Sequence, residues 1–213
     1  MMKISEMLRV YFIMGSNNCT GDPLEVLESA LKGGITLFQL REKGANAKTG
    51  KKKKELALKM KELCHRYEVP FVVNDDVSLA LEIEADGIHV GQDDEPVSEI
   101  KEKCPERMII GVSATNGQEA VEAVKDGADY IGVGPIFSTD TKVDAKKPIG
   151  LEGVSRIRKL VGDIPMVAIG GIKAVHASDI IDAGADGVSV ITAISAAASP
   201  EAAAREIKEK IGE

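Results

Sequence analysis

The stretch GADYIGV (residues 127–133) contains the unit from which most of the chain is built. A helix ends at a glycine, an Ala-Asp pair turns the chain, and a short apolar run follows. Related turns occur at residues 85–87 and 184–187, and each precedes another apolar run. The repeat is expected to have the period of one strand–helix unit, and it is too short to indicate gene duplication.

Eight apolar runs rich in Val and Ile occur along the chain, and a helix-like stretch follows each. Continuous apolar runs are typical of parallel strands buried on both faces. The predicted strands are residues 10–14, 36–40, 71–73, 87–90, 108–112, 130–133, 166–169 and 187–191. Amphipathic spacing predicts helices that include 23–32, 50–67, 117–126, 151–160 and 174–183. We expect an α/β fold, one (β/α)8 TIM barrel over residues 1–213, with its active site at the carboxyl ends of the strands.

The composition, with 44% hydrophobic and 29% charged residues, is that of an ordinary soluble globule. A net charge of −7 and the absence of Trp argue against nucleic-acid binding. Three cysteines without a Cys-x-x-Cys pair suit a reducing compartment. The sequence has no apolar run long enough for a signal peptide or a membrane span. We expect a cytoplasmic protein that acts on small molecules, and the sequence leaves its oligomeric state open, a homo-oligomer included.

The segment FQLREKG (residues 38–44) carries Gln39, Arg41 and Lys43 at alternate positions where the second strand ends. Alternation sends these three side chains to one side, where guanidinium and ammonium groups can bind phosphate oxygens. Glu42 points the other way and can pair with a neighbour. The alternative is a solvated strand end with ordinary ion pairs, but a basic pair in a net-acidic chain favours an anion site.

Two acidic pairs follow the third and fourth strands, in VVNDD (residues 72–76) and HVGQDD (residues 89–94). Adjacent parallel strands lie about 5 Å apart, so a carboxylate from each loop can reach one magnesium ion. Helix capping is the alternative, with Asp75 or Asp76 as one cap and Asp94 as the other. The nearby anion site favours the metal.

A second anion site is predicted after the seventh and eighth strands. The glycines of AIGGI (residues 168–172) let backbone N–H groups approach a phosphate, at the usual phosphate site of such barrels. Ile191 and Thr192 would complete this site, with Ser195 as a further candidate. The Thr-rich loop after the sixth strand, which ends in Lys142, suits an anion that is enclosed after binding.

The three histidines do not assemble into a familiar catalytic set. No Ser–His–Asp arrangement or metal-binding His pair can be built from the sequence. His89 is interpreted as a hydrogen-bonded barrel residue, and His65 and His176 as exposed helix residues. A mechanism without a side-chain nucleophile is therefore favoured.

These segments together resemble the thiamine phosphate synthase family from Val10 to about Ile211. The resemblance rests on VYFIMGSNN, FQLREKG, FVVNDD, ADGIHVGQDD, IIGVSA, GADYIGVGPIF, TDTK, AIGGI and ADGVSVITAIS, in consistent order. It implies that a hydroxymethylpyrimidine diphosphate is joined to a hydroxyethylthiazole phosphate. In the implied dissociative mechanism, diphosphate departs first and leaves a pyrimidine cation, which the thiazole nitrogen captures.

The resemblance also implies roles for individual residues. Asp75 and Asp94 match the magnesium ligands, and Arg41, Lys43, Ser113 and Lys142 would act in catalysis on the departing diphosphate. The residues implied to hold the pyrimidine diphosphate are Gln39, Arg41, Lys43, Asn74, Ser113 and Lys142. Those implied to hold the thiazole phosphate are Thr139, Thr141, Gly171, Ile191 and Thr192.

Three alternatives use the same barrel. A thiazole tautomerase-like relative would need an acid–base residue in place of metal and diphosphate chemistry. A phosphosugar isomerase or epimerase would share only the phosphate site at Gly170 and Gly171. A non-catalytic ligand-binding regulator would be expected to have lost a metal or diphosphate residue, and none is lost here.

Overall fold

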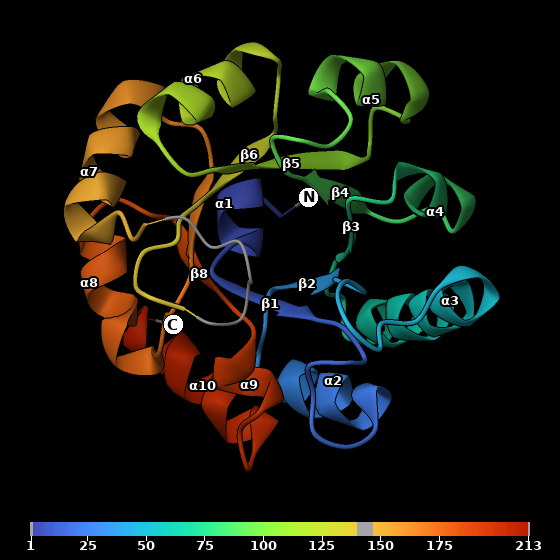
Figure 1. Cartoon of the computed structure of the whole chain (residues 1–213). Helices are drawn as coiled ribbons and strands as arrows, with labels where there is room; N and C mark the ends of the chain where they lie inside the picture. Colours follow the sequence, from blue (N-terminus) through green and yellow to red (C-terminus); the bar gives the residue numbers. More distant parts are fainter. Residues whose placement is uncertain (1, 140–146, 213) are drawn as a thin grey trace.

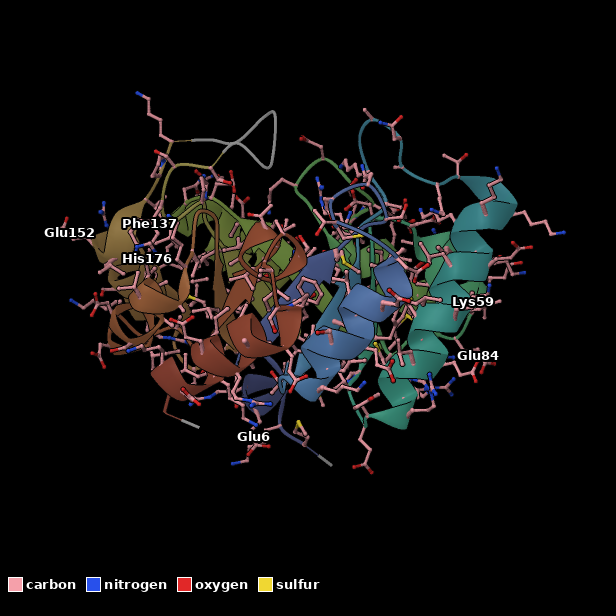
Figure 2. All side chains as sticks on the ribbon, turned by 90° about the horizontal axis from the view of Figure 1, so that it is seen from below. Glu6, Lys59, Glu84, Phe137, Glu152 and His176 are labelled. Atoms are coloured by element: carbon pink, nitrogen blue, oxygen red, sulfur yellow. The ribbon has the colours of Figure 1, made fainter. Side chains whose placement is uncertain are left out.

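The computed structural model describes residues 2–139 and 147–212. Eight parallel strands pair in sequence order, β1 to β8, and β8 pairs with β1 to close the barrel (Figure 1). Helices surround the strands, and the short α1 (Ile4–Met7) precedes β1 at the amino end of the barrel. Figure 2 shows Glu6 of α1 at the bottom of the molecule in a view turned by 90°. The predicted (β/α)8 TIM barrel is confirmed.

The strands agree with the predicted runs to within two residues at either end. They are β1 Val10–Met14, β2 Leu37–Leu40, β3 Phe71–Asn74, β4 Gly87–Val90, β5 Ile109–Ala114, β6 Tyr130–Val133, β7 Met166–Ile169 and β8 Gly187–Val190. The range predicted for β5, residues 108–112, begins and ends too early in the sequence. The strand continues to Ala114 and contains Ser113. The predicted eighth strand was one residue too long, because Ile191 leaves the extended conformation and precedes the next helix.

The outer helices are α2 Pro23–Lys32, α3 Gly50–Arg66, α4 Val77–Glu82, α5 Val97–Lys103, α6 Gly117–Lys125, α7 Gly150–Val161, α8 Ala177–Asp182, α9 Thr192–Ser195 and α10 Pro200–Lys210. Five of them, α2, α3, α6, α7 and α8, occupy the predicted amphipathic stretches, and no range was predicted for the others. The single helix predicted over 174–183 was wrong in detail, because a 3-10 turn, η1 (Ala174–His176), precedes α8. Within the described ranges, no helix has the length and apolar character needed to cross a bilayer.

The strands separate two apolar layers. Outward-facing residues such as Phe12 and Phe38 pack with the helices in the larger cluster. Inward-facing residues such as Tyr11, Val72 and Tyr130 form a smaller cluster inside the barrel. Burial on both faces explains why the strands are continuous apolar runs.

The Asp of the repeated turn has a defined structural role. Asp86, Asp129 and Asp186 stand just before β4, β6 and β8, and each carboxylate accepts, at 2.8 Å, a backbone N–H from the first or second residue of the preceding strand. Thr36 does the same before β2, where its Oγ1 accepts from Val10 N at 2.8 Å. The expected period of one strand–helix unit was therefore wrong, because the device recurs before every second strand. It satisfies backbone donors that would otherwise be unpaired at the amino end of the barrel.

Candidate active site

The barrel opens into a cavity of about 950 Å3 that is lined by residues following the carboxyl ends of the strands. The predicted site residues among its lining are Arg41, Lys43, Asn74, Asp75, Asp94, Ser113, Thr139, Gly171, Ile191 and Thr192. Gln39 lines a smaller cavity of about 20 Å3, which Arg41, Asn74 and Ser113 also line. Thr141 and Lys142 lie outside the described residues. The structure thus brings together nearly all predicted site residues that it describes.

Asp75 and Asp94 face each other across the loops after β3 and β4. Their carboxyl groups share a hydrogen bond, and Lys43 Nζ lies 2.8 Å from Asp75 Oδ2. The backbone N–H of Gly91 donates to Asp94 at 2.7 Å, which holds the second carboxyl group in place. Asp75 has a positive φ of 60° and donates its own N–H to the His89 carbonyl at 2.9 Å.

The two carboxyl groups differ in acidity because their surroundings differ. Burial acts to raise the pKa of Asp75, but the hydrogen bond and charge of Lys43 outweigh it, so this pKa is lowered. Burial raises the pKa of Asp94, and Asp75 adds to the increase against the hydrogen bond from Gly91. Two carboxyl groups this close require a proton or a cation between them.

This pair fits magnesium by its chemistry. Within residues 2–139 and 147–212, no cluster of three or more His, Cys, Asp or Glu side chains is arranged to hold a metal. Magnesium commonly needs only one or two carboxylates from the protein, because water and substrate phosphates supply the remaining ligands. Asp75 and Asp94 are such a pair beside a basic cluster, so the residues present fit the ion.

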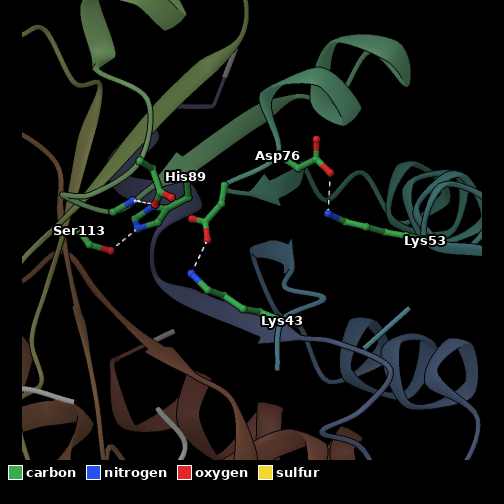
Figure 3. A network of polar contacts seen from close by, with 8 residues as sticks. Lys43, Lys53, Asp76, His89 and Ser113 are labelled. Atoms are coloured by element: carbon green, nitrogen blue, oxygen red, sulfur yellow. Dashed lines mark hydrogen bonds and ion pairs between the residues drawn. The ribbon is translucent and has the colours of Figure 1, made fainter. Parts of the chain in front are cut away.

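The neighbouring Asp76 performs the capping function that the sequence left open between Asp75 and Asp76. Its carboxylate accepts from Leu79 N at 3.0 Å at the start of α4, and pairs with Lys53 at 2.6 Å. Figure 3 shows Asp76 directed toward Lys53 and away from His89 and Ser113. Asp94 is not a helix cap, because Pro96 occupies that position before α5. Each of the two carboxylates at the cavity is therefore free of a capping role.

The segment after β2 places its charges as the alternation predicts. Arg41 lines both cavities, and Lys43 reaches Asp75. The hydrogen bond to Asp75 raises the pKa of Lys43, so this side chain stays cationic. Glu42 points away and accepts hydrogen bonds from the backbone N–H groups of Ser16 at 2.5 Å and Lys48 at 2.6 Å. It thereby ties together the loops that follow β1 and β2.

The loops that follow β7 and β8 carry the second predicted anion site. Gly170 and Gly171 have positive φ values of 105° and 65°, a conformation that glycine adopts without strain. Thr192 begins the short α9 beside them on the cavity wall. Ser195 does not contribute as the sequence suggested, because it is fully buried and donates to the Asn18 carbonyl at 2.7 Å.

Sequence reasoning missed a polar residue at the base of the cavity. Ser189 of β8 is only 2% exposed and lines both cavities. Its hydroxyl has no hydrogen-bond partner among the described residues, so it is available to a ligand or to water. A single Ser inside the apolar GVSV strand was the only available signal.

The histidines are placed largely as predicted. His89 is a buried barrel residue with hydrogen bonds to Tyr130 and Ser113, and His65 is exposed and paired with Asp86 at 2.8 Å. The expectation of an exposed His176 was wrong, because its ring packs on Phe137 at a centroid distance of 4.4 Å (Figure 2). His176 therefore supports the segment that follows β6.

A closed (β/α)8 barrel with cations, a carboxylate pair and a glycine turn around one cavity defines an enzyme of phosphorylated small molecules. Residues 10–194 match the family model described as thiamine monophosphate synthase. The chain belongs to this family, as its motifs indicated.

Individual relatives agree over nearly the whole chain. The thiamine-phosphate synthase of Bacillus mycoides is 54% identical over 98% of this chain and 95% of its own length. That of Bacillus cereus is 52% identical over the same shares. The structure of thiamine phosphate pyrophosphorylase from Pyrococcus furiosus superposes with a TM-score of 0.88, at 35% identity over 98% of each chain. A 3-hexulose-6-phosphate synthase structure, at 15% identity and a TM-score of 0.72, shares the fold.

Proposed function

We propose that this transferase joins a hydroxymethylpyrimidine diphosphate to a hydroxyethylthiazole phosphate and releases diphosphate. The observation that carries the proposal is that two groups of residues suited to binding anions line one cavity. Arg41 and Lys43 follow β2, and Gly171 and Thr192 follow β7 and β8. Two phosphorylated substrates can therefore bind at once, with their reacting ends between the two groups.

The pyrimidine diphosphate is held by Arg41, Lys43, Asn74 and Ser113, with Gln39 in the smaller cavity that Arg41, Asn74 and Ser113 also line. Arg41 and Lys43 neutralise the diphosphate, and Lys142, which lies outside the described residues, is proposed to act with them. These charges stabilise the diphosphate as it acquires negative charge, which is where fixed cations are most effective. The thiazole phosphate is held by Thr139, Gly171, Ile191 and Thr192, and by Thr141, which lies outside the described residues.

The proposed chemistry needs positioning and no side-chain nucleophile. The carbon–oxygen bond to diphosphate breaks first, and its electron pair leaves with the diphosphate. The thiazole nitrogen then donates its electron pair to the pyrimidine cation and forms the new carbon–nitrogen bond. No proton has to be removed from either substrate, which agrees with the structural roles of the histidines. Holding both substrates in one cavity supplies the proximity that this capture requires.

Magnesium is the proposed cofactor, and Asp75 and Asp94 would hold it. When bound, the ion neutralises charge on the diphosphate oxygens. Lys43 forms an ion pair with Asp75 and keeps that carboxyl group ionised. We also place the reaction in the cytoplasm, which suits the three unpaired thiols Cys19, Cys64 and Cys104.

The test is a coupling assay with both substrates and magnesium, with thiamine phosphate as the measured product. We expect product only when both substrates are present, and diphosphate released in equal amount. A tautomerase or isomerase would turn over one phosphorylated ligand by itself, and a regulator would bind without turnover. Either of these results would contradict the proposed function.

A further inference from the structure

A chain of buried hydrogen bonds crosses the barrel between Gln39 and Ser113. Gln39 Nε2 lies 2.6 Å from Tyr11 Oη, and Tyr11 Oη lies 2.8 Å from Tyr130 Oη. Tyr130 Oη lies 3.0 Å from His89 Nδ1, and His89 Nε2 lies 2.9 Å from Ser113 Oγ. Figure 3 shows the last of these contacts, with the His89 ring directed at Ser113. Five strands, β1, β2, β4, β5 and β6, contribute one residue each.

The part of this hydrogen-bond chain that precedes the cavity is shielded from water. Gln39 and Tyr11 are each 1% exposed, and Tyr130 is fully buried. Burial raises the pKa of Tyr11 and of Tyr130, so both hydroxyl groups keep their protons. Each tyrosine therefore has one hydrogen to donate and must place it on a neighbour within the chain.

The direction of each hydrogen bond follows from Gln39, the first residue of the hydrogen-bond chain. An amide nitrogen only donates, so Tyr11 accepts from Gln39 and gives its own hydrogen to Tyr130. Tyr130 then gives its hydrogen to His89 Nδ1, which must be unprotonated. The imidazole proton is consequently on Nε2 and is donated to Ser113 Oγ.

We propose that Tyr11, Tyr130 and His89 are positioning residues that make Ser113 a hydrogen-bond donor toward the cavity. Because Ser113 Oγ already accepts from His89, its own hydrogen is left for a ligand. In the reverse order, Ser113 would donate to His89 and present a lone pair to the cavity. A lone pair repels a phosphate oxygen, whereas an O–H group binds it. This direction of the hydrogen bonds therefore suits Ser113 to an anionic ligand. The choice of an anion as the ligand rests on the proposed function.

The barrel interior is shaped around this chain by two strand glycines. A Cβ atom on Gly111 of β5 would lie 2.0 Å from Tyr130 Cζ and 2.4 Å from its hydroxyl oxygen. A Cβ atom on Gly132 of β6 would lie 3.2 Å from His89 Cε1. Larger residues at these positions would displace the Tyr130 and His89 rings, so both glycines provide space for the chain.

The first test is the position of the imidazole proton, measured by 15N NMR on the full chain without substrate. The His89 signals are identified by their loss in a His89→Gln variant, which separates them from His65 and His176. We expect the proton on Nε2 in the parent protein. We expect Tyr130→Phe to abolish this preference, because Nδ1 loses its donor. A proton on Nδ1 in the parent protein would overturn the proposal, whatever reaction the enzyme catalyses.

The second test is a double-mutant cycle on the single-turnover rate. Tyr130→Phe is expected to lower this rate roughly tenfold with little change in the KM for the pyrimidine diphosphate. Tyr11→Phe should have a smaller effect, because Tyr130 can still donate to His89. In a Ser113→Ala background, Tyr130→Phe should cause no further loss, since its effect passes through Ser113.

The matched control is Tyr67→Phe, which removes a hydroxyl that donates to Glu28 at 3.1 Å outside the barrel interior. It should leave the rate unchanged, and melting curves confirm that every variant is folded. Additive losses for Ser113→Ala and Tyr130→Phe would contradict the proposal and leave Tyr130 with a packing role alone. If the parent protein forms no thiamine phosphate in the coupling assay, the proposed function is refuted. The NMR result then decides whether the hydrogen-bond chain has the proposed direction.

Discussion

Replacement of either cavity carboxylate by its amide, Asp75→Asn or Asp94→Asn, is expected to lower turnover about a thousandfold with the fold intact. An amide keeps the shape of the side chain but binds magnesium far more weakly than a carboxylate does. Loss of the ion would remove several kcal/mol of charge stabilisation from the departing diphosphate. Asn also adopts the positive φ of Asp75 readily, so this change introduces no new backbone strain. Steady-state turnover over a magnesium titration is the measurement.

The matched control is Asp76→Asn, the same substitution one residue further along. Asn caps a helix as well as Asp does, so α4 should keep the hydrogen bond from Leu79 N while the ion pair with Lys53 is lost. Because Asp76 points away from the cavity, turnover should stay close to that of the parent enzyme. Full activity of the parent after exhaustive chelation would refute the metal site.

Gly171→Ala is expected to weaken binding of the thiazole phosphate at least tenfold, about 1.4 kcal/mol, and largely to spare the pyrimidine diphosphate. The structure gives the reason. A Cβ atom at this position would lie 2.5 Å from the Ser138 carbonyl oxygen and 2.9 Å from Phe137 Cβ. The segment leading to Thr139 must therefore move, and Thr139 lines the proposed thiazole phosphate site. Calorimetric titration of each substrate separately measures both affinities, and Gly171→Val should have a larger effect.

Gly162→Ala serves as the control for backbone strain. Gly162 has a φ of 66°, close to the 65° of Gly171, but a Cβ atom there meets no other atom within 4 Å. This variant should lose about 1 to 3 kcal/mol of folding stability and bind both substrates normally. Equal weakening of both ligands in Gly171→Ala would count against two separate anion sites. Binding of only one phosphorylated ligand under every condition would count against the synthase itself.

The barrel could be predicted because its strands are buried on both faces. Runs such as Val10–Met14 and Tyr130–Val133 are apolar throughout, and a glycine turn such as Gly127 precedes several of the strands. The ends of the strands could be predicted less exactly, because local side-chain hydrogen bonds determine them. Thr36 was assigned to β2, but its hydroxyl bonds both Val10 N and the Met7 carbonyl, and the strand begins one residue later.

The site could be predicted in outline because polar residues at the ends of parallel strands must converge. Which of two adjacent acids faces the cavity followed from the family resemblance and could not be predicted from the residue pattern itself. Asp75 and Asp76 have the same chemistry, and only the left-handed turn at Asp75 sends one to the cavity and the other to α4.

The buried hydrogen-bond chain was beyond sequence reasoning for a different reason. Tyr11 and Tyr130 occur in apolar runs, where an aromatic residue is expected to pack against other apolar side chains. Their hydroxyl groups meet because β1 and β6 face each other across the closed barrel, a contact between residues 119 positions apart. Sequence patterns describe neighbours along the chain and around a helix, but not which interior side chains meet at the barrel axis.

Asp75 is also a position where selection for folding and selection for activity oppose each other. A left-handed residue that touches a second carboxyl group is costly to the folded chain, and glycine would relieve both the strain and the repulsion. Asp75→Gly is therefore expected to remove these two costs, and with them the ion pair with Lys43 and the reaction. Any stabilisation of this enzyme, by consensus substitutions or by design, therefore has to keep Asp75.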